Sequence, residues 1–138
     1  MTSGLYGFIE DGEYFATRNN SDSYPSGLGL EFFTSCKNGD YSGYPIFEND
    51  IWFIHNSLFC EWAYFYDKDK KIFEIWKGYQ TNPDLSNPFG KIQKEGYYPC
   101  KRLFKGNIDL LAPEVFTKDI INKLISIQRE EKLNKLIK

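Results

Sequence analysis

The sequence is poor in the side chains that build metal sites and disulfide frameworks. It has one histidine, His55, and three cysteines, Cys36, Cys60 and Cys100, with no Cys-x-x-Cys pair. A structural zinc site needs about four closely spaced nitrogen or sulfur ligands, so we expect neither a metal site nor a bound cofactor. The odd number and wide spacing of the cysteines predict buried free thiols in a reducing cytoplasm.

The sequence also lacks a long apolar run and a strong charge of either sign. No segment approaches the ~18 consecutive apolar residues that cross a bilayer. The short apolar run 5–9 is interrupted by Gly7 and followed by two acidic residues, which is not the pattern of a signal peptide. The net charge is −2, whereas nucleic-acid binding needs a basic field. We therefore expect neither a membrane nor a nucleic acid as a partner.

Aromatic residues are abundant instead. They make up 18% of a chain of 138 residues, a length that suits one domain with a sizeable core, here residues 1–138. Aromatic side chains favour strands, and disordered chains lack them. This composition predicts a folded, soluble protein built around a sheet.

The alternation of apolar residues and the turn residues between them predict two hairpins. The first joins runs 5–9 and 13–17 through Asp11-Gly12, because glycine accepts the positive φ of a tight turn. The second joins the aromatic run 59–66 to run 72–76 through a charged tip. Two further strands are expected at residues 51–55 and 97–104, with a long polar loop over residues 81–95.

Two segments have helical spacing of apolar residues. Residues 28–37 predict a short helix that stops at Asn38-Gly39. Residues 117–138 predict a long C-terminal helix, with Thr117 as its cap and one apolar stripe. The fold class that follows is α+β. We expect an antiparallel, aromatic-rich sheet of five to six strands, a short helix after the first hairpin and a long C-terminal helix.

The end of the C-terminal helix is a candidate contact surface. Its first half should pack on the sheet, whereas Leu133, Leu136 and Ile137 lie in the second half among charged residues. If this half extends beyond the sheet, it would offer its apolar side chains to a partner or to a second copy of the chain. The C-terminal helix is therefore the expected contact of any homo-oligomer.

The loop of residues 19–29 is the richest segment in specific polar groups. It leaves a strand and enters a helix, so its side chains and free backbone N–H groups gather around one spot. Three interpretations stay open: a capped structural loop, a ligand or catalytic site, and a partner-binding loop. The candidate residues share this loop and are Asn19, Asn20, Asp22, Ser23, Tyr24, Gly27 and Gly29.

Asp67, Asp69 and Lys71 imitate the first positions of a calcium-binding loop. Lys71 stands where an oxygen ligand is needed, and Gly78 occupies the position where a glutamate would complete the site. The segment is therefore interpreted as a solvated hairpin turn.

The loop and both hairpins carry a resemblance to a known family. The motifs are Gly4-Leu5-Tyr6-Gly7-Phe8, then Asn19-x-x-Asp22-Ser23-Tyr24-Pro25-x-Gly27-Leu28-Gly29, and then Cys60-Glu61-Trp62-Ala63-Tyr64 with Asp67-x-Asp69 and Phe73-Glu74-Ile75-Trp76-Lys77-Gly78. They resemble a family of small uncharacterised proteins carried by phages and prophages, with relatives in fungi. Members of that family commonly have His where this chain has Asn20 and an aromatic residue where it has Ser21, a departure that disfavours catalysis here.

Together these features predict a small non-enzymatic binding protein. The resemblance implies that a phage or mobile element encodes it, that it resides in the host cytoplasm and that it acts on a host protein, for example as a counter-defence inhibitor. The alternative is a small enzyme, or a protein that binds a small ligand or nucleotide, using the 19–29 loop. In that alternative Asp22 would orient the ligand or transfer a proton, and backbone N–H groups near Gly27 and Gly29 would hold an anion.

Overall fold

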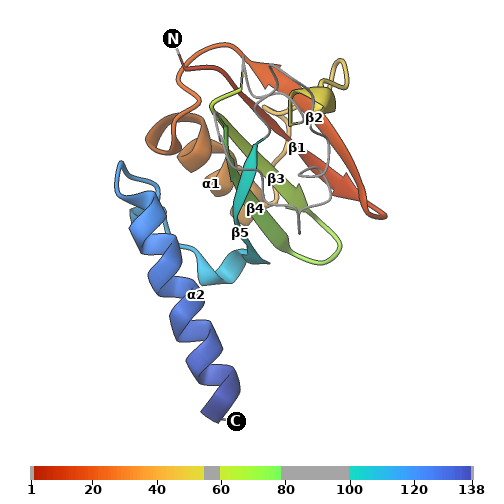
Figure 1. The fold of residues 1–138 in the computed structure, drawn as a ribbon. Coiled ribbons are helices and arrows are strands. Elements are labelled where there is room, and N and C mark those ends of the chain that lie inside the picture. Colours follow the sequence, from red (N-terminus) through yellow and green to blue (C-terminus); the bar gives the residue numbers. More distant parts are fainter. Residues whose placement is uncertain (1, 55–59, 79–99, 138) are drawn as a thin grey trace.

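The computed structural model describes residues 2–54, 60–78 and 100–137. Five strands form one sheet, and they are β1 (Gly4–Glu10), β2 (Glu13–Asn19), β3 (Trp62–Asp67), β4 (Ile72–Lys77) and β5 (Lys101–Asn107). The two α-helices are α1 (Leu30–Asn38) and α2 (Ile120–Ile137). Short helical segments connect them, and they are η1 (Pro25–Gly29), η2 (Ile51–Ile54), η4 (Ile108–Leu110) and η5 (Pro113–Val115). Figure 1 shows this α+β arrangement.

The strand order in the sheet is β2-β1-β3-β4-β5. Three neighbouring pairs are antiparallel, but β1 and β3 run parallel, with Gly4 beside Trp62 and Phe8 beside Tyr66. The sheet is therefore mixed, and the prediction of an antiparallel sheet is wrong for this pair. A parallel pair needs a long crossover, which α1 and the chain around it supply here. No short sequence motif predicts such a parallel pairing of distant strands.

Both predicted hairpins are confirmed. Asp11 and Gly12 adopt φ values of 52° and 80°, which is the left-handed backbone that the tight β1–β2 turn requires. At the β3–β4 turn, the Asp67 carboxylate Oδ1 accepts hydrogen bonds from the N–H groups of Asp69 and Lys70, both at 3.1 Å. The first aspartate of the calcium-like segment thus fixes the turn.

The predicted short helix is present, although α1 begins at Leu30 because the kinked turn η1, in which Gly27 has non-helical backbone angles, precedes it. Its predicted end is confirmed, since Gly39 has φ 71° and donates to the carbonyl of Cys36 at 3.3 Å. Phe32 and Phe33 are buried against the sheet.

Residues 51–54 form the 3-10 helix η2, so the strand predicted at 51–55 is wrong. The chain just before it is tied to β2: Asn49 Oδ1 accepts from the N–H of Ala16 at 3.0 Å, and the Asp50 N–H donates to the Ala16 carbonyl at 2.8 Å. These bonds outweigh the β propensity of the apolar side chains. The end of that segment, His55, and the predicted loop 81–95 lie outside the described residues, as does the start of the predicted last strand, which is described from Lys101.

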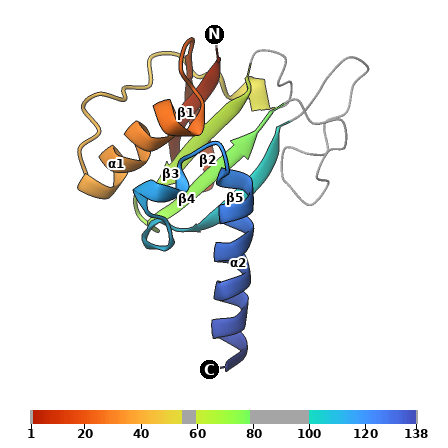
Figure 2. The ribbon, with the colours of Figure 1, turned by 90° about the vertical axis from the view of Figure 1, so that its left-hand side faces the viewer.

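The sheet buries apolar side chains on both faces, and the aromatic residues gather mainly on one. Both α-helices approach this same face (Figure 2). The buried residues on the helix-covered face include Tyr6, Phe8, Phe32, Phe33, Tyr64, Phe73, Phe104 and Phe116. A smaller cluster on the opposite face contains Leu5, Ile9, Ala16, Ile54, Cys60, Ala63, Phe65, Trp76 and Cys100. The sheet therefore forms the middle layer of the core.

Only the first turns of α2 pack on this core. Ile120 and Leu124 are buried, and Gln128 still donates to the Leu103 carbonyl at 3.1 Å. Beyond this point the helix projects away from the sheet (Figures 1 and 2), and Leu133 and Leu136 are 58% and 82% exposed. The prediction that the second half extends beyond the sheet is confirmed. No helix in the described parts of the chain combines the length and the apolar character needed to cross a bilayer.

Candidate functional site

The 19–29 loop folds back on itself through backbone hydrogen bonds. Asp22 has the left-handed φ of 54°, and its carbonyl accepts from the Leu28 N–H at 2.8 Å. The Gly27 N–H donates to the Tyr24 carbonyl at 2.9 Å. A Cβ atom on Gly27 would lie 2.3 Å from the Asp22 carbonyl oxygen, so only glycine fits this close approach.

These bonds decide what the loop can hold. The N–H groups of Gly27 and Leu28 donate to carbonyls of the loop, as does that of Gly29, which lies 3.4 Å from the Tyr24 carbonyl. The backbone N–H groups near Gly27 and Gly29, which were predicted to bind an anion, therefore donate their hydrogen bonds within the loop. These three N–H groups are therefore not available to an incoming anion.

The base of the loop is anchored in the core through Ser23, which is fully buried. Its hydroxyl accepts from Asn19 Nδ2 at 2.8 Å, and its carbonyl accepts from the Tyr64 hydroxyl at 2.9 Å. Asn19 Nδ2 also donates to the Ser21 carbonyl at 2.5 Å. Gly29 packs against the Tyr64 ring, where a Cβ atom would come within 2.9 Å of it. Ser23 and Gly29 thus anchor the loop to the core.

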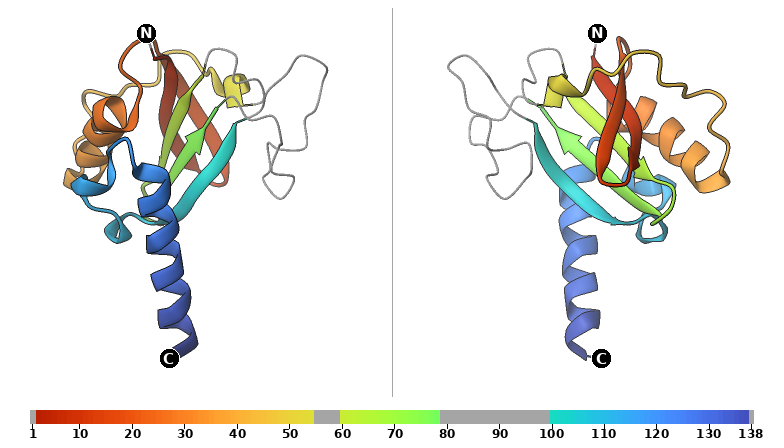
Figure 3. Two further views of the ribbon diagram at one scale, coloured as in Figure 1. Left: turned by 60° about the vertical axis from the view of Figure 1, so that its left-hand side comes forward. Right: turned by 90° about the vertical axis from the view of Figure 1, so that its right-hand side faces the viewer.

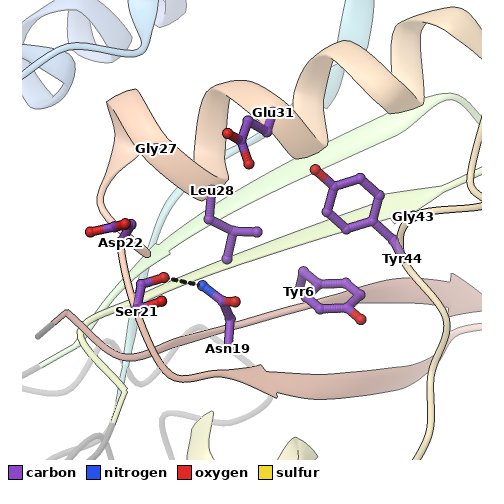
Figure 4. Close-up of a pocket in the computed structure, with 9 residues that line it drawn as sticks. All are labelled: Tyr6, Asn19, Ser21, Asp22, Gly27, Leu28, Glu31, Gly43 and Tyr44. Carbon is purple, nitrogen blue, oxygen red and sulfur yellow. Dashed lines mark hydrogen bonds between the residues drawn. The ribbon is translucent and has the colours of Figure 1, made fainter.

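Above this anchor lies an open pocket of about 430 Å³, here called the loop pocket (Figure 4). It is lined by Tyr6, Asn19, Ser21, Asp22, Gly27, Leu28, Glu31, Gly43 and Tyr44. Three of the predicted site residues, Asn19, Asp22 and Gly27, meet in it. The carboxylates of Asp22 and Glu31 are both on the exposed side, with no hydrogen bond or ion pair to another described residue. The loop pocket is therefore polar and acidic.

Two tyrosines form its far wall. The Tyr6 hydroxyl donates to the Pro45 carbonyl at 2.7 Å, which holds that ring against the segment after α1. Burial, and after it the negative charge of Glu31, raise the pKa of the Tyr44 hydroxyl. This hydroxyl therefore remains protonated at neutral pH, and it can both donate and accept a hydrogen bond.

The remaining predicted residues lie outside the loop pocket. Asn20 is exposed. Tyr24 is 41% exposed and lines a separate hollow of about 440 Å³, together with Pro25, Ser26, Thr117 and Lys118. Sequence reasoning missed Glu31, although its place in the first turn of α1, four residues after Gly27, puts it on the loop's side of that helix.

A second polar cluster, on the opposite face of the sheet, was also missed. The carboxylate of Glu74 in β4 is 1% exposed and accepts hydrogen bonds from the Tyr14 hydroxyl, at 2.8 and 2.7 Å to its two oxygens. It also accepts from Trp76 Nε1 at 2.9 Å, and Arg102 Nη1 lies 4.0 Å away. The sequence held a signal for this cluster, because Glu74 is an acidic residue flanked by apolar residues on both sides in β4.

The cysteines lie where buried thiols were expected, since all three are buried and none forms a disulfide. The sulfur atoms of Cys60 and Cys100 are 3.9 Å apart, and the contact with Cys60, together with burial, raises the pKa of the Cys100 thiol. Within the described ranges, no three His, Cys, Asp or Glu side chains are grouped so as to hold a metal ion.

Comparison of the chain with models of protein families, with curated proteins and with solved structures gave no significant match. The class that can be stated is therefore structural: an α+β protein with a mixed five-stranded sheet and an acidic pocket beside the first helix. The resemblance to phage-borne proteins remains a prediction.

Proposed function

We propose that this chain is a small non-enzymatic binding protein that acts on another protein, and that the loop pocket contacts the partner. The observation that carries the proposal is the pairing of a rigid loop with exposed charges. Ser23 and the internal backbone bonds fix the loop, while the Asp22 and Glu31 carboxylates face solvent. Exposed carboxylates suit ion pairing, whereas acid–base catalysis usually relies on partly buried groups.

The pocket's chemistry favours a basic group on the partner. A lysine or arginine side chain would meet two carboxylates, the Tyr44 hydroxyl and the edge of an apolar wall formed by Leu28 and Tyr6. At surface sites each such ion pair contributes only about 0–1 kcal/mol. The pocket would therefore set the orientation of the partner more than the total affinity.

The resemblance to phage-borne proteins motivates the rest of the proposal. A phage or mobile element would encode the protein, and the partner would be a protein in the cytoplasm of the host cell, for example a component of a defence system. This step rests on association with the family and not on the geometry of the pocket.

A pulldown from host lysate tests the proposal. The wild-type chain should retain one protein in stoichiometric amount, and the double variant Asp22→Asn/Glu31→Gln should retain much less of it. Glu13→Gln is the matched control, because Glu13 is an exposed carboxylate at the start of β2 that does not line the loop pocket. Recovery of no stoichiometric protein, or equal recovery by all three chains, would refute the proposal.

The size of the loop pocket supports one alternative, a small-ligand or nucleotide-binding protein or a small enzyme using the 19–29 loop. At about 430 Å³ it lies within the range of ~300–1,000 Å³ typical of small-molecule sites. A nucleotide would bring its phosphates next to two carboxylates, so a cationic ligand fits this alternative better. Native mass spectrometry of the purified protein distinguishes the two, since a retained small molecule favours the alternative.

The exposed end of α2 is a second contact candidate and supports the expected homo-oligomer. Replacing Leu133 and Leu136 by serine should leave the fold intact, since both side chains are exposed. Light scattering should then give a lower molar mass than for the wild type if this surface joins two copies. An unchanged molar mass would show that the end of α2 makes no such contact.

A further inference from the structure

We propose that the face of the sheet opposite the helices carries a binding site for a phosphate group. The site is a pocket of about 190 Å³, here called the sheet pocket. It is lined by Ile9, Gly12, Tyr14, Asp67, Lys70, Ile72, Glu74, Arg102 and Lys105. Its lining includes Gly12 from the β1–β2 turn and Lys70 from the β3–β4 turn. The right-hand panel of Figure 3 shows the face of the sheet opposite the helices. This inference does not depend on the function proposed for the loop pocket.

The charges in the sheet pocket are separated by depth. Its two carboxylates are at the bottom, where Glu74 is 1% exposed and Asp67 is 7% exposed. Lys70 and Lys105 are exposed at the rim. A group that enters from solvent therefore meets ammonium groups first.

The two carboxylates already have their donors. Glu74 accepts from the Tyr14 hydroxyl and from Trp76 Nε1, and Asp67 accepts from the N–H groups of its own turn. Neither therefore needs the rim lysines as partners. Within the described parts of the chain, the ammonium groups of Lys70 and Lys105 have no hydrogen bond or ion pair.

Arg102 links the bottom of the pocket to its rim. Its guanidinium carbon lies 5.9 Å from the centre of the Trp76 ring, and its Nη1 lies 4.0 Å from Glu74, which is longer than a hydrogen bond. The side chain is 24% exposed, so it is oriented by the sheet and still reaches the pocket. An oriented guanidinium presents several N–H donors to one anion.

The size of the pocket and the number of cations identify the ligand class. A volume of about 190 Å³ is below that of usual small-molecule sites, so it suits a terminal group and not a whole cofactor. A phosphate monoester carries about −1.5 to −2 charges and three acceptor oxygens at neutral pH, which matches Lys70, Arg102 and Lys105. A carboxylate offers one charge and two oxygens, and would therefore engage fewer of these donors.

An NMR titration of the whole chain tests the site. Inorganic phosphate should shift the amide signals of Gly12, Lys70 and Lys105 in a saturable way, whereas chloride at equal ionic strength should not. O-phosphoserine serves as a second probe. Binding of either probe supports the site, and the tighter one shows whether the source is the free ion or an ester.

Three variants make the test decisive. Lys105→Gln should weaken binding about tenfold, as expected for the loss of one charge-assisted contact. Lys132→Gln, an equal charge change on the projecting part of α2, should not alter it. Arg102→Gln should also weaken binding, but it removes a neighbour of buried Glu74, so Lys105→Gln provides the independent readout. Absence of saturable shifts, or equal binding by the Lys105 and Lys132 variants, would overturn the proposal.

Discussion

The two pockets use charged side chains in opposite ways. In the loop pocket the carboxylates of Asp22 and Glu31 are exposed, and the fold is held by backbone bonds and by buried Ser23. In the sheet pocket a buried carboxylate, Glu74, is itself part of the structure, because donors from β2 and β4 converge on it. Removing a carboxylate charge from the loop pocket should therefore leave the stability of the fold unchanged. Removing the carboxylate of Glu74 from the sheet pocket should lower it.

The largest expected effect is that of Glu74→Ala, which tests the coupling directly. Removing the buried carboxylate takes away the acceptor of the hydrogen bonds from the Tyr14 hydroxyl and Trp76 Nε1, and the opposite charge near Arg102. We expect the free energy of unfolding, measured by urea denaturation, to fall by about 3–5 kcal/mol. The exposed Glu13 is the control, and Glu13→Ala should change the value by less than about 0.5 kcal/mol. Equal effects of the two substitutions would show that Glu74 is not structural.

A smaller loss is expected at the backbone of the loop pocket. Gly27→Ala places a Cβ atom 2.3 Å from the Asp22 carbonyl oxygen, so the loop must shift. We expect a loss of about 1–3 kcal/mol in the same measurement. Gly43 lines the same pocket, but a Cβ atom added there would meet nothing within 4 Å, so Gly43→Ala should be neutral. If both variants unfold alike, the close contact at Gly27 does not determine the loop structure.

High pH should lower the free energy of unfolding through Tyr14, which lines the sheet pocket. Burial and the charge of Glu74 raise the pKa of the Tyr14 hydroxyl above its ordinary value of 10.0. A raised pKa in the folded state means that the stability contributed by Tyr14 is fully present below pH ~10 and is lost as the pH rises further. Urea denaturation between about pH 8 and 11 should therefore show a decline that is shallower in Tyr14→Phe. An identical decline in the variant would assign the alkaline sensitivity to other buried tyrosines.

The smallest effect is expected at Asp22. Its carboxylate is exposed and its φ of 54° lies in the region that asparagine adopts readily. Asp22→Asn should therefore shift the melting temperature by no more than about 2 °C while it weakens partner binding. Asp22→Val is the contrasting variant, because a β-branched residue disfavours this backbone and should lower the melting temperature. A clear drop for Asp22→Asn with binding retained would mean that the carboxylate serves the fold.

Local features of the fold were predictable from the sequence, and long-range pairings were not. The Asp11-Gly12 turn, the stop at Gly39 and the free end of α2 each depend on a few neighbouring residues. The parallel pairing of β1 with β3 depends on contacts between distant segments. The same is true of η2, where bonds from residues 49 and 50 to Ala16 replaced the expected strand.

The candidate site shows the same division. Asn19, Asp22 and Gly27 could be selected because loop chemistry is visible in a short stretch. Glu31 and Tyr44 join them only after α1 has packed on the sheet. The sheet pocket could not be predicted from the sequence, because its lining residues come from all five strands and from two turns.

The parallel contact between β1 and β3 has a consequence for how fast the chain folds. Each hairpin is local and can form within about 1–10 μs, but joining them means closing the loop from Gly4 to Trp62. Such non-local pairings slow folding relative to that of chains with mainly local contacts. Until the hairpins join, the inner edges of β1 and β3 remain unpaired and open to other chains. Because the 19–29 loop and α1 lie within the connection being closed, we expect the loop pocket to be completed in the same step that protects these edges.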